Sequence, residues 1–187
     1  RLDKIISSNK NFEGIKILYR PHPWRQSDEI LSLDNLNNII IDPQIQTEYY
    51  KKNTSTDVQP KLDYYPSLIQ NSEFVIGGLT SMLIESLIFR KRYIALAHDD
   101  KKNLTSQHNI LKNYIHFDGI EHIEAVNICN DLNDLESLME MAVCKRDQED
   151  FIKCDLQREY FLYKKQNINF RDHLLEIIDK ILKNKTI

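Results

Sequence analysis

The first candidate for a functional residue in this sequence is a histidine between two prolines. His22 stands between Pro21 and Pro23, directly after the apolar run at residues 15–20. Because proline fixes its own φ and lacks an N–H group, a strand must end here and the backbone that carries the imidazole is restricted. A histidine aimed in this way can donate a hydrogen bond or a proton to a phosphate group.

A second group of residues combines glycines with hydroxyl side chains. Gly77 and Gly78 end an apolar run, and Thr80 and Ser81 follow after one further residue. Glycine lets the backbone approach a neighbour closely, and hydroxyl residues at the start of a helix cap its N–H groups or bind a phosphate oxygen. We expect Gly78 and both hydroxyl residues to bind a phosphate, with Gly77 in a structural role. Plain helix capping is the alternative for the hydroxyl pair.

A carboxylate follows the hydroxyl pair at helical spacing. Glu85 comes four residues after Ser81, about one helical turn, so the two side chains share a helix face. Its neighbours are apolar, and a carboxylate in such surroundings needs a partner, for which the ribose hydroxyls of a nucleotide are suited. Four further residues are expected to line the same cleft: Arg20, Trp24, Asp63 and Tyr64.

Short apolar runs alternate with helical patterns up to about residue 129. Runs typical of strands occupy residues 15–20, 38–41, 74–77, 93–97 and 124–129, and helical patterns occupy residues 63–72 and 82–89. This alternation predicts an α/β fold, a Rossmann-like parallel sheet of about five strands flanked by helices. Ligands bind such sheets beyond the carboxyl ends of the strands, and both His22 and the hydroxyl pair follow strands.

The last third of the chain has only helical patterns. Apolar residues recur at helical spacing over residues 132–143, and further helices are predicted at residues 151–164 and 170–182. We therefore divide the chain into a Rossmann-like domain at residues 1–129 and a helical C-terminal extension, residues 130–187, packed on the same domain. The chain starts with Arg1 inside a helical pattern, which indicates a fragment of a longer protein.

Composition excludes several classes of protein. With 25 basic and 28 acidic residues the net charge is −3, so no strong positive field is present to hold a nucleic acid. No apolar run approaches the ~20 residues of a membrane span. The three cysteines lack CxxC spacing and are read as core-filling thiols of a reducing compartment: Cys129, Cys144 and Cys154. The segment His98-Asp99-Asp100 lacks further ligands, so no metal site is assigned.

Taken together, these segments resemble a known family. Arg20-Pro21-His22-Pro23 after one strand and Gly77-Gly78-Leu79-Thr80-Ser81 with Glu85 after another resemble the HP and S motifs of bacterial GT-B sialyltransferases and Kdo transferases. Similar HP elements occur in CDP-glycerol glycerophosphotransferases. The resemblance covers about residues 15–97. It implies one half of a GT-B fold, a CMP-linked or other nucleotide-linked sugar donor, inverting transfer, and no metal or other cofactor.

The resemblance also implies roles for individual residues. His22 would contact the donor phosphate and protonate the leaving group, while Thr80 and Ser81 would bind the same phosphate. The threonine before the serine departs from the usual pair of the family, so the hydroxyl that makes the main contact stays open. In the family, the catalytic base and most of the acceptor site belong to an N-terminal domain. The resemblance implies that this domain lies outside the given chain, so we expect the chain alone not to catalyse transfer.

The full-length protein would then be a glycosyltransferase of bacterial surface polysaccharide synthesis, of capsule or lipopolysaccharide. It would act on a glycan acceptor in the cytoplasm, at the inner face of the membrane with peripheral association. Two other functions stay open: a CDP-glycerol-type polyol phosphotransferase, and a non-catalytic nucleotide-binding or scaffolding module of a capsule-assembly complex. A sugar epimerase of related architecture is also open, whereas the missing GxGxxG turn argues against an NAD-linked dehydrogenase.

Overall fold

The chain is an α/β protein with parallel strands. The computed structural model describes residues 1–20, 32–43, 63–99, 101, 106–144 and 170–184. Its strands are β1 (Ile17–Tyr19), β2 (Ile39–Ile41), β3 (Phe74–Gly77), β4 (Arg92–Leu96) and β5 (Val126–Cys129). Its α-helices are α1 (Leu2–Ser8), α4 (Tyr64–Asn71), α5 (Ser81–Ile88), α6 (Gln107–Asn113), α7 (Leu135–Cys144) and α9 (Phe170–Asn184). Short 3-10 turns occupy Lys10–Phe12, Ser32–Asn35, Ile115–Phe117, Ile120–His122 and Leu132–Asp134.

The five predicted strands are all present, and each boundary lies within two residues of its predicted position. They form two parallel sheets rather than the single sheet that the sequence suggested. In the first, β1 pairs with β2 so that Leu18 lies opposite Ile40. In the second, the order is β3-β4-β5, with Ile76 opposite Ile94. The strands of the smaller sheet are three residues long, so their hydrogen-bonded ladder is short.

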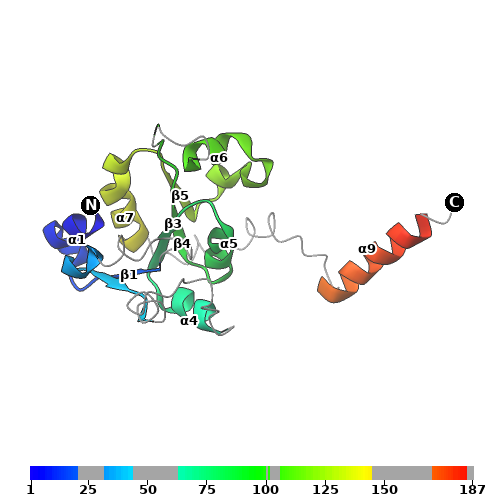
Figure 1. Cartoon of the computed structure of the whole chain (residues 1–187), viewed down its shortest axis with the longest axis horizontal. Coiled ribbons are helices and arrows are strands. Elements are labelled where there is room, and N and C mark those ends of the chain that lie inside the picture. The colour runs from blue at the N-terminus through cyan, green and yellow to red at the C-terminus, as the bar shows by residue number, and fades with distance from the viewer. Residues whose placement is uncertain (21–31, 44–62, 100, 102–105, 145–169, 185–187) are drawn as a thin grey trace.

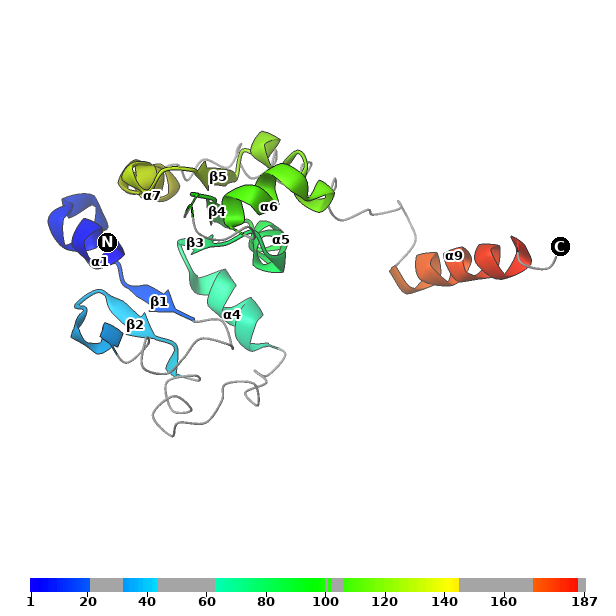
Figure 2. The ribbon, with the colours of Figure 1, turned by 45° about the horizontal axis from the view of Figure 1, so that its top comes forward.

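The smaller sheet lies beside the larger one, with β1 on the β3 side of β2 (Figure 2). Ile17 of β1 packs against the same hydrophobic cluster as Phe74 and Ile76 of β3. Along the chain, β2 is added on one side of β1, and β3 lies on the other side. The direction in which strands are added therefore reverses between β1 and β3, across the two sheets, as it does at the topological switch point of a single open parallel sheet.

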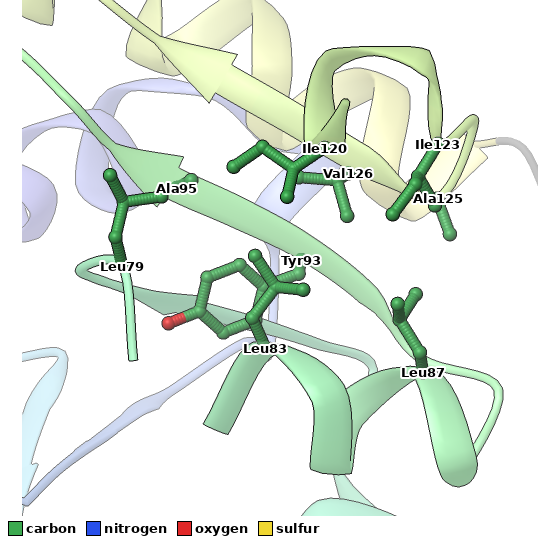
Figure 3. Close-up of a cluster of buried hydrophobic side chains, with 9 residues drawn as sticks. All are labelled: Leu79, Leu83, Leu87, Tyr93, Ala95, Ile120, Ile123, Ala125 and Val126. Carbon is green, nitrogen blue, oxygen red and sulfur yellow. The ribbon is translucent and has the colours of Figure 1, made fainter. Parts of the chain in front are cut away.

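The hydrophobic core has two parts, one on each face of the larger sheet. Successive side chains of a strand point to opposite faces, so Tyr93 and Ala95 of β4 enter one cluster while Ile94 enters the other. Figure 3 shows the first cluster, in which the Tyr93 ring lies among apolar side chains with its hydroxyl group on the side of Leu79. Strand β4 is therefore the buried centre of the fold.

Helices cover both faces of this sheet. Figures 1 and 2 show α5 and α6 on one side, and α1 and α7 on the other. Helix α7 buries Leu135, Met139 and Ala142, whose spacing of four and three residues places them on one face. The prediction of a buried helical stripe after residue 130 is confirmed for this helix. Helix α6 was not predicted, because Gln107, His108 and Asn109 at its start carry no apolar pattern.

The C-terminal helix α9 lies apart from the rest of the described chain in Figure 1. Its large apolar side chains are exposed: Leu174, Leu175, Ile177, Ile178, Ile181 and Leu182. The helix predicted at 170–182 is thus present, whereas the helix predicted at 151–164 lies outside the described residues. The division into a domain at 1–129 and a packed extension at 130–187 stays a prediction.

The structure bears on two expectations from composition, one about the cysteines and one about membrane spans. Cys129 is fully buried, as expected of a core thiol, but Cys144 is exposed because it ends α7, which corrects its assignment to the core. Burial raises the pKa of the Cys129 thiol, and nearby Asp134 and Asp131 raise it further. Cys154 lies outside the described residues. Among the helices that the structure describes, none is long and apolar enough to cross a membrane.

Candidate functional site

The turn between β3 and α5 carries the predicted hydroxyl pair. Strand β3 ends at Gly77 and helix α5 begins at Ser81, so the predicted order of strand, glycines, hydroxyls and helix is confirmed. Thr80 is the N-cap of α5, and its hydroxyl oxygen accepts a hydrogen bond from the Met82 N–H at 3.3 Å. Ser81 lies in the first turn and is exposed. The two hydroxyls therefore differ: Thr80 caps the helix, while Ser81 faces solvent at its positive end.

Side chains of the protein itself pack closely against the two glycines. A Cβ atom at Gly77 would collide with the hydroxyl of Tyr93, and one at Gly78 would lie 2.8 Å from Oε1 of Gln107. The Tyr93 hydroxyl donates a hydrogen bond to the Gly78 carbonyl at 2.6 Å. The space beside the glycines, which the sequence assigned to a ligand, is thus occupied on these sides by β4 and α6.

Gln107 makes a second contact with this turn. Its Oε1 accepts a hydrogen bond from the Leu79 N–H at 2.5 Å. The peptide group between Gly78 and Leu79 is therefore bound at both ends, its carbonyl by β4 and its N–H by α6. A peptide held in this way has a defined orientation, and so has the start of the helix that follows.

Tyr93 is the central side chain of this arrangement. It is fully buried in the core, and burial raises its pKa to about 12, an effect that the adjacent Thr80 side chain partly offsets. The raised pKa extends the pH range over which the phenol is neutral and keeps its proton for the Gly78 carbonyl. A tyrosine held in this state acts as a fixed hydrogen-bond donor.

Glu85 lies one turn into α5, as predicted. Its side chain is half-buried, and Ser81 precedes it by four residues on the same face of the helix. The structure shows no hydrogen bond from another described side chain to this carboxylate. The proposed contact with ribose hydroxyls stays a prediction.

A polar cluster lies at the carboxyl ends of β1 and β2. We call it the strand-end cluster: Arg20, Asp42, Tyr64 and Tyr65. Arg20 follows β1, and its guanidinium contacts the carboxylate of Asp42, after β2, at 2.5 Å. The Tyr64 hydroxyl, in the first turn of α4, donates a hydrogen bond to the same carboxylate. The Arg20 Nε donates to the Tyr65 hydroxyl at 2.6 Å.

The electrostatics of the strand-end cluster follow from burial. Asp42 is 0% exposed, so its charge requires the neighbouring guanidinium and hydroxyl. The guanidinium also lies over both aromatic rings, 4.5 Å from the Tyr65 centroid and 5.4 Å from that of Tyr64. Burial raises the pKa of Tyr64 to about 12, and the hydrogen bond to Asp42 adds to the rise. The cluster thus joins the smaller sheet to α4.

The structure brings together some of the predicted site residues. Arg20 and Tyr64, both expected to line a cleft, meet around Asp42. Asp63 is exposed at the N-cap position of α4, where its side chain makes no capping hydrogen bond. Four predicted residues lie outside the described residues: Pro21, His22, Pro23 and Trp24.

Sequence reasoning missed four residues that shape these two regions: Asp42, Tyr65, Tyr93 and Gln107. Asp42 offered a signal, because it directly follows a predicted strand and precedes a proline. Tyr93 and Gln107 offered none, since each reaches a turn that is distant in sequence. Such contacts exist only after the sheet has formed.

The described residues contain no group of three or more histidine, cysteine or acidic side chains arranged to hold a metal ion. The fold and these two regions define a class, a Rossmann-like parallel α/β protein with polar side chains at the carboxyl ends of its strands. Comparisons with protein-family models, curated proteins and solved structures found no match for this chain.

Proposed function

We propose that this chain is the donor-nucleotide-binding part of an inverting glycosyltransferase that needs no metal and uses a CMP-linked or other nucleotide-linked sugar. The observation that carries the proposal is the exposed Ser81 at the first turn of α5, directly beyond the carboxyl end of β3. A helix N-terminus has unpaired N–H groups and the positive end of a dipole, both of which favour a phosphate.

The topology supports this position for the donor. The strand order reverses between β1 and β3, and ligands of open parallel sheets bind beyond the carboxyl ends at such a reversal. Arg20, the first residue of one motif, lies at the carboxyl end of β1, and Thr80 of the other motif follows β3, so these two residues lie on either side of the reversal. His22 follows Arg20 by two residues, and we assign it the donor phosphate and the leaving group.

Titration calorimetry of this chain with CMP, CDP, UDP and GDP tests the proposal. We expect CMP or CDP to bind, and the replacements His22→Ala and Ser81→Ala each to weaken binding about ten- to a hundredfold, the effect of one lost hydrogen bond to a charged group. Ser137→Ala is a matched control, because Ser137 is also an exposed serine in the first turn of a helix.

Two outcomes would contradict the proposal. One is that no nucleotide binds. The other is that Ser81→Ala affects binding no more than Ser137→Ala does. Both would favour helix capping as the whole role of the hydroxyl pair.

For the full-length protein we propose a role in bacterial surface polysaccharide synthesis in the cytoplasm, with peripheral association at the membrane and no nucleic-acid partner. The acceptor glycan would be bound mainly by a domain outside this chain. Product analysis with the full-length protein distinguishes the alternatives, because a glycosidic bond supports the glycosyltransferase and a phosphodiester supports a polyol phosphotransferase. Nucleotide binding without transfer to any acceptor would support a binding or scaffolding module.

A further inference from the structure

Gln107 connects α6 to the turn that precedes α5. It is the first residue of α6, which follows β4 beyond the carboxyl end of that strand. From there its amide oxygen reaches the Leu79 N–H at 2.5 Å. Leu79 directly precedes the N-cap Thr80, so this bond acts on the residue from which the helix starts.

The packing around Gly78 involves the same side chain. The three atoms closest to an added Cβ all belong to Gln107: Oε1 at 2.8 Å, Cδ at 3.1 Å and Nε2 at 3.5 Å. A methyl group at this position would therefore displace the glutamine side chain, which is flexible, rather than the backbone. Displacement would break the hydrogen bond to the Leu79 N–H.

We propose that Gln107 is a positioning residue for the phosphate-binding turn, and that residue 78 is glycine because a side chain there would displace Gln107. The inference rests on the proposed function, since it concerns the same turn. Gln107 holds the Leu79 N–H while Tyr93 holds the Gly78 carbonyl, so the peptide between them cannot rotate. The orientation of the Ser81 end of α5 is thereby set by α6 and β4.

A different role of Gly78 predicts a different result. If residue 78 is glycine to admit a phosphate group, then Gly78→Ala blocks the ligand whether or not Gln107 is present. If it is glycine to admit Gln107, the alanine acts only through the lost hydrogen bond. A double-mutant cycle separates these cases, because two replacements that remove one interaction are not additive.

The cycle uses the full 187-residue chain and two measurements. CMP affinity is measured by calorimetry, and hydrogen exchange of the Leu79 amide by NMR, for Gln107→Ala, Gly78→Ala and the double variant. We expect each single variant to weaken CMP binding about fivefold and to speed Leu79 exchange about tenfold. The double variant should lose no more CMP affinity, and should exchange the Leu79 amide no faster, than either single variant.

Gln107→Glu is the conservative control. A carboxylate keeps an acceptor oxygen in the same place, so Leu79 exchange should remain slow, as in the unaltered chain. Rapid Leu79 exchange in this variant would overturn the proposal, as would unchanged exchange in Gln107→Ala.

The remaining outcomes separate this inference from the proposed function. An unaltered chain that binds no nucleotide overturns both, even where Leu79 exchange responds to Gln107. If the unaltered chain binds CMP and the losses of CMP affinity in the two single variants add up in the double variant, the inference is overturned and the proposed function still stands. Non-additive losses in both measurements support the two together.

Discussion

At the scale of single residues, the strand-end cluster is held by a buried charge. Asp42 is 0% exposed, and the Arg20 guanidinium is its positive partner at 2.5 Å. Removing one member of a buried pair leaves the other charge without compensation, which costs more than the pair itself contributes. The cluster is therefore more sensitive to the loss of Arg20 than to the loss of a single hydroxyl.

Replacing Arg20 tests this reasoning. We expect Arg20→Met to lower the free energy of unfolding by about 3–5 kcal/mol, measured by urea denaturation at pH 7. Tyr65→Phe is the matched control, since it removes one hydrogen bond but keeps the ring under the guanidinium, and should cost about 1.5 kcal/mol. Equal losses in the two variants would show that the charge of Asp42 is compensated by other groups.

The raised pKa of Tyr93 predicts that the folded chain loses stability at high pH. Its pKa in the folded chain is about 12, against an ordinary value of 10.0 for tyrosine, so folding favours the neutral phenol. This contribution is fully present below pH 10 and is lost as the pH rises towards 12, because the unfolded chain releases the proton first. The loss is about 2 kcal/mol at pH 12 and approaches about 3 kcal/mol, the value of two pKa units, only at higher pH.

Urea denaturation between pH 8 and pH 12 measures this effect. In Tyr93→Phe the stability should fall less steeply with pH, and the remaining slope should include Tyr64, whose pKa is also raised to about 12. The slopes are compared rather than the absolute values, because the phenylalanine also lacks the hydrogen bond to Gly78. Identical slopes in both proteins would mean that Tyr93 titrates normally.

At the scale of elements, the start of α5 combines capping and proposed binding in neighbouring residues. Thr80 accepts a hydrogen bond from the Met82 N–H, whereas Ser81 is exposed. We expect Thr80→Ala to lower stability by about 1 kcal/mol and Thr80→Ser to restore it, because serine also caps helices. Ser81→Ala should change stability by less than about 0.5 kcal/mol, as is typical of surface positions.

Thermal unfolding and CMP affinity are both measured for Thr80→Ala, Thr80→Ser and Ser81→Ala. A stability loss in Thr80→Ala together with a binding loss in Ser81→Ala would assign different roles to the two hydroxyls. The reverse pattern, with stability lost in Ser81→Ala, would contradict the assignment of the cap to Thr80.

At the scale of the whole molecule, the described core does not depend on α9. Both hydrophobic clusters are formed by residues before Cys144, and the large apolar side chains of α9 are exposed. We expect removal of residues 170–187 to change the free energy of unfolding by less than about 0.5 kcal/mol, measured by urea denaturation. A loss of several kcal/mol would instead show that the extension packs on the domain, as the sequence predicted.

The sequence by itself determined the local elements. The run 74–77, the glycine pair and the hydroxyl pair predicted a strand, a turn and a helix start, and the structure has them in that order. The apolar spacing over residues 132–143 likewise predicted a buried helix face, and the structure buries Leu135 and Met139 of that pattern, together with Ala142. These predictions succeed because a strand and a helix each leave a pattern of fixed period in their own residues.

Only the tertiary structure decided which distant residues meet. The strand pairs of the two sheets, the contact of Arg20 with Asp42 and the hydrogen bond of Gln107 with Leu79 each join segments 18 or more residues apart. No local pattern records such pairs, because each depends on register and on how helices pack across the sheet. The glycines show the difference: their position was evident from the sequence, but the side chains that pack against them, Tyr93 and Gln107, were not.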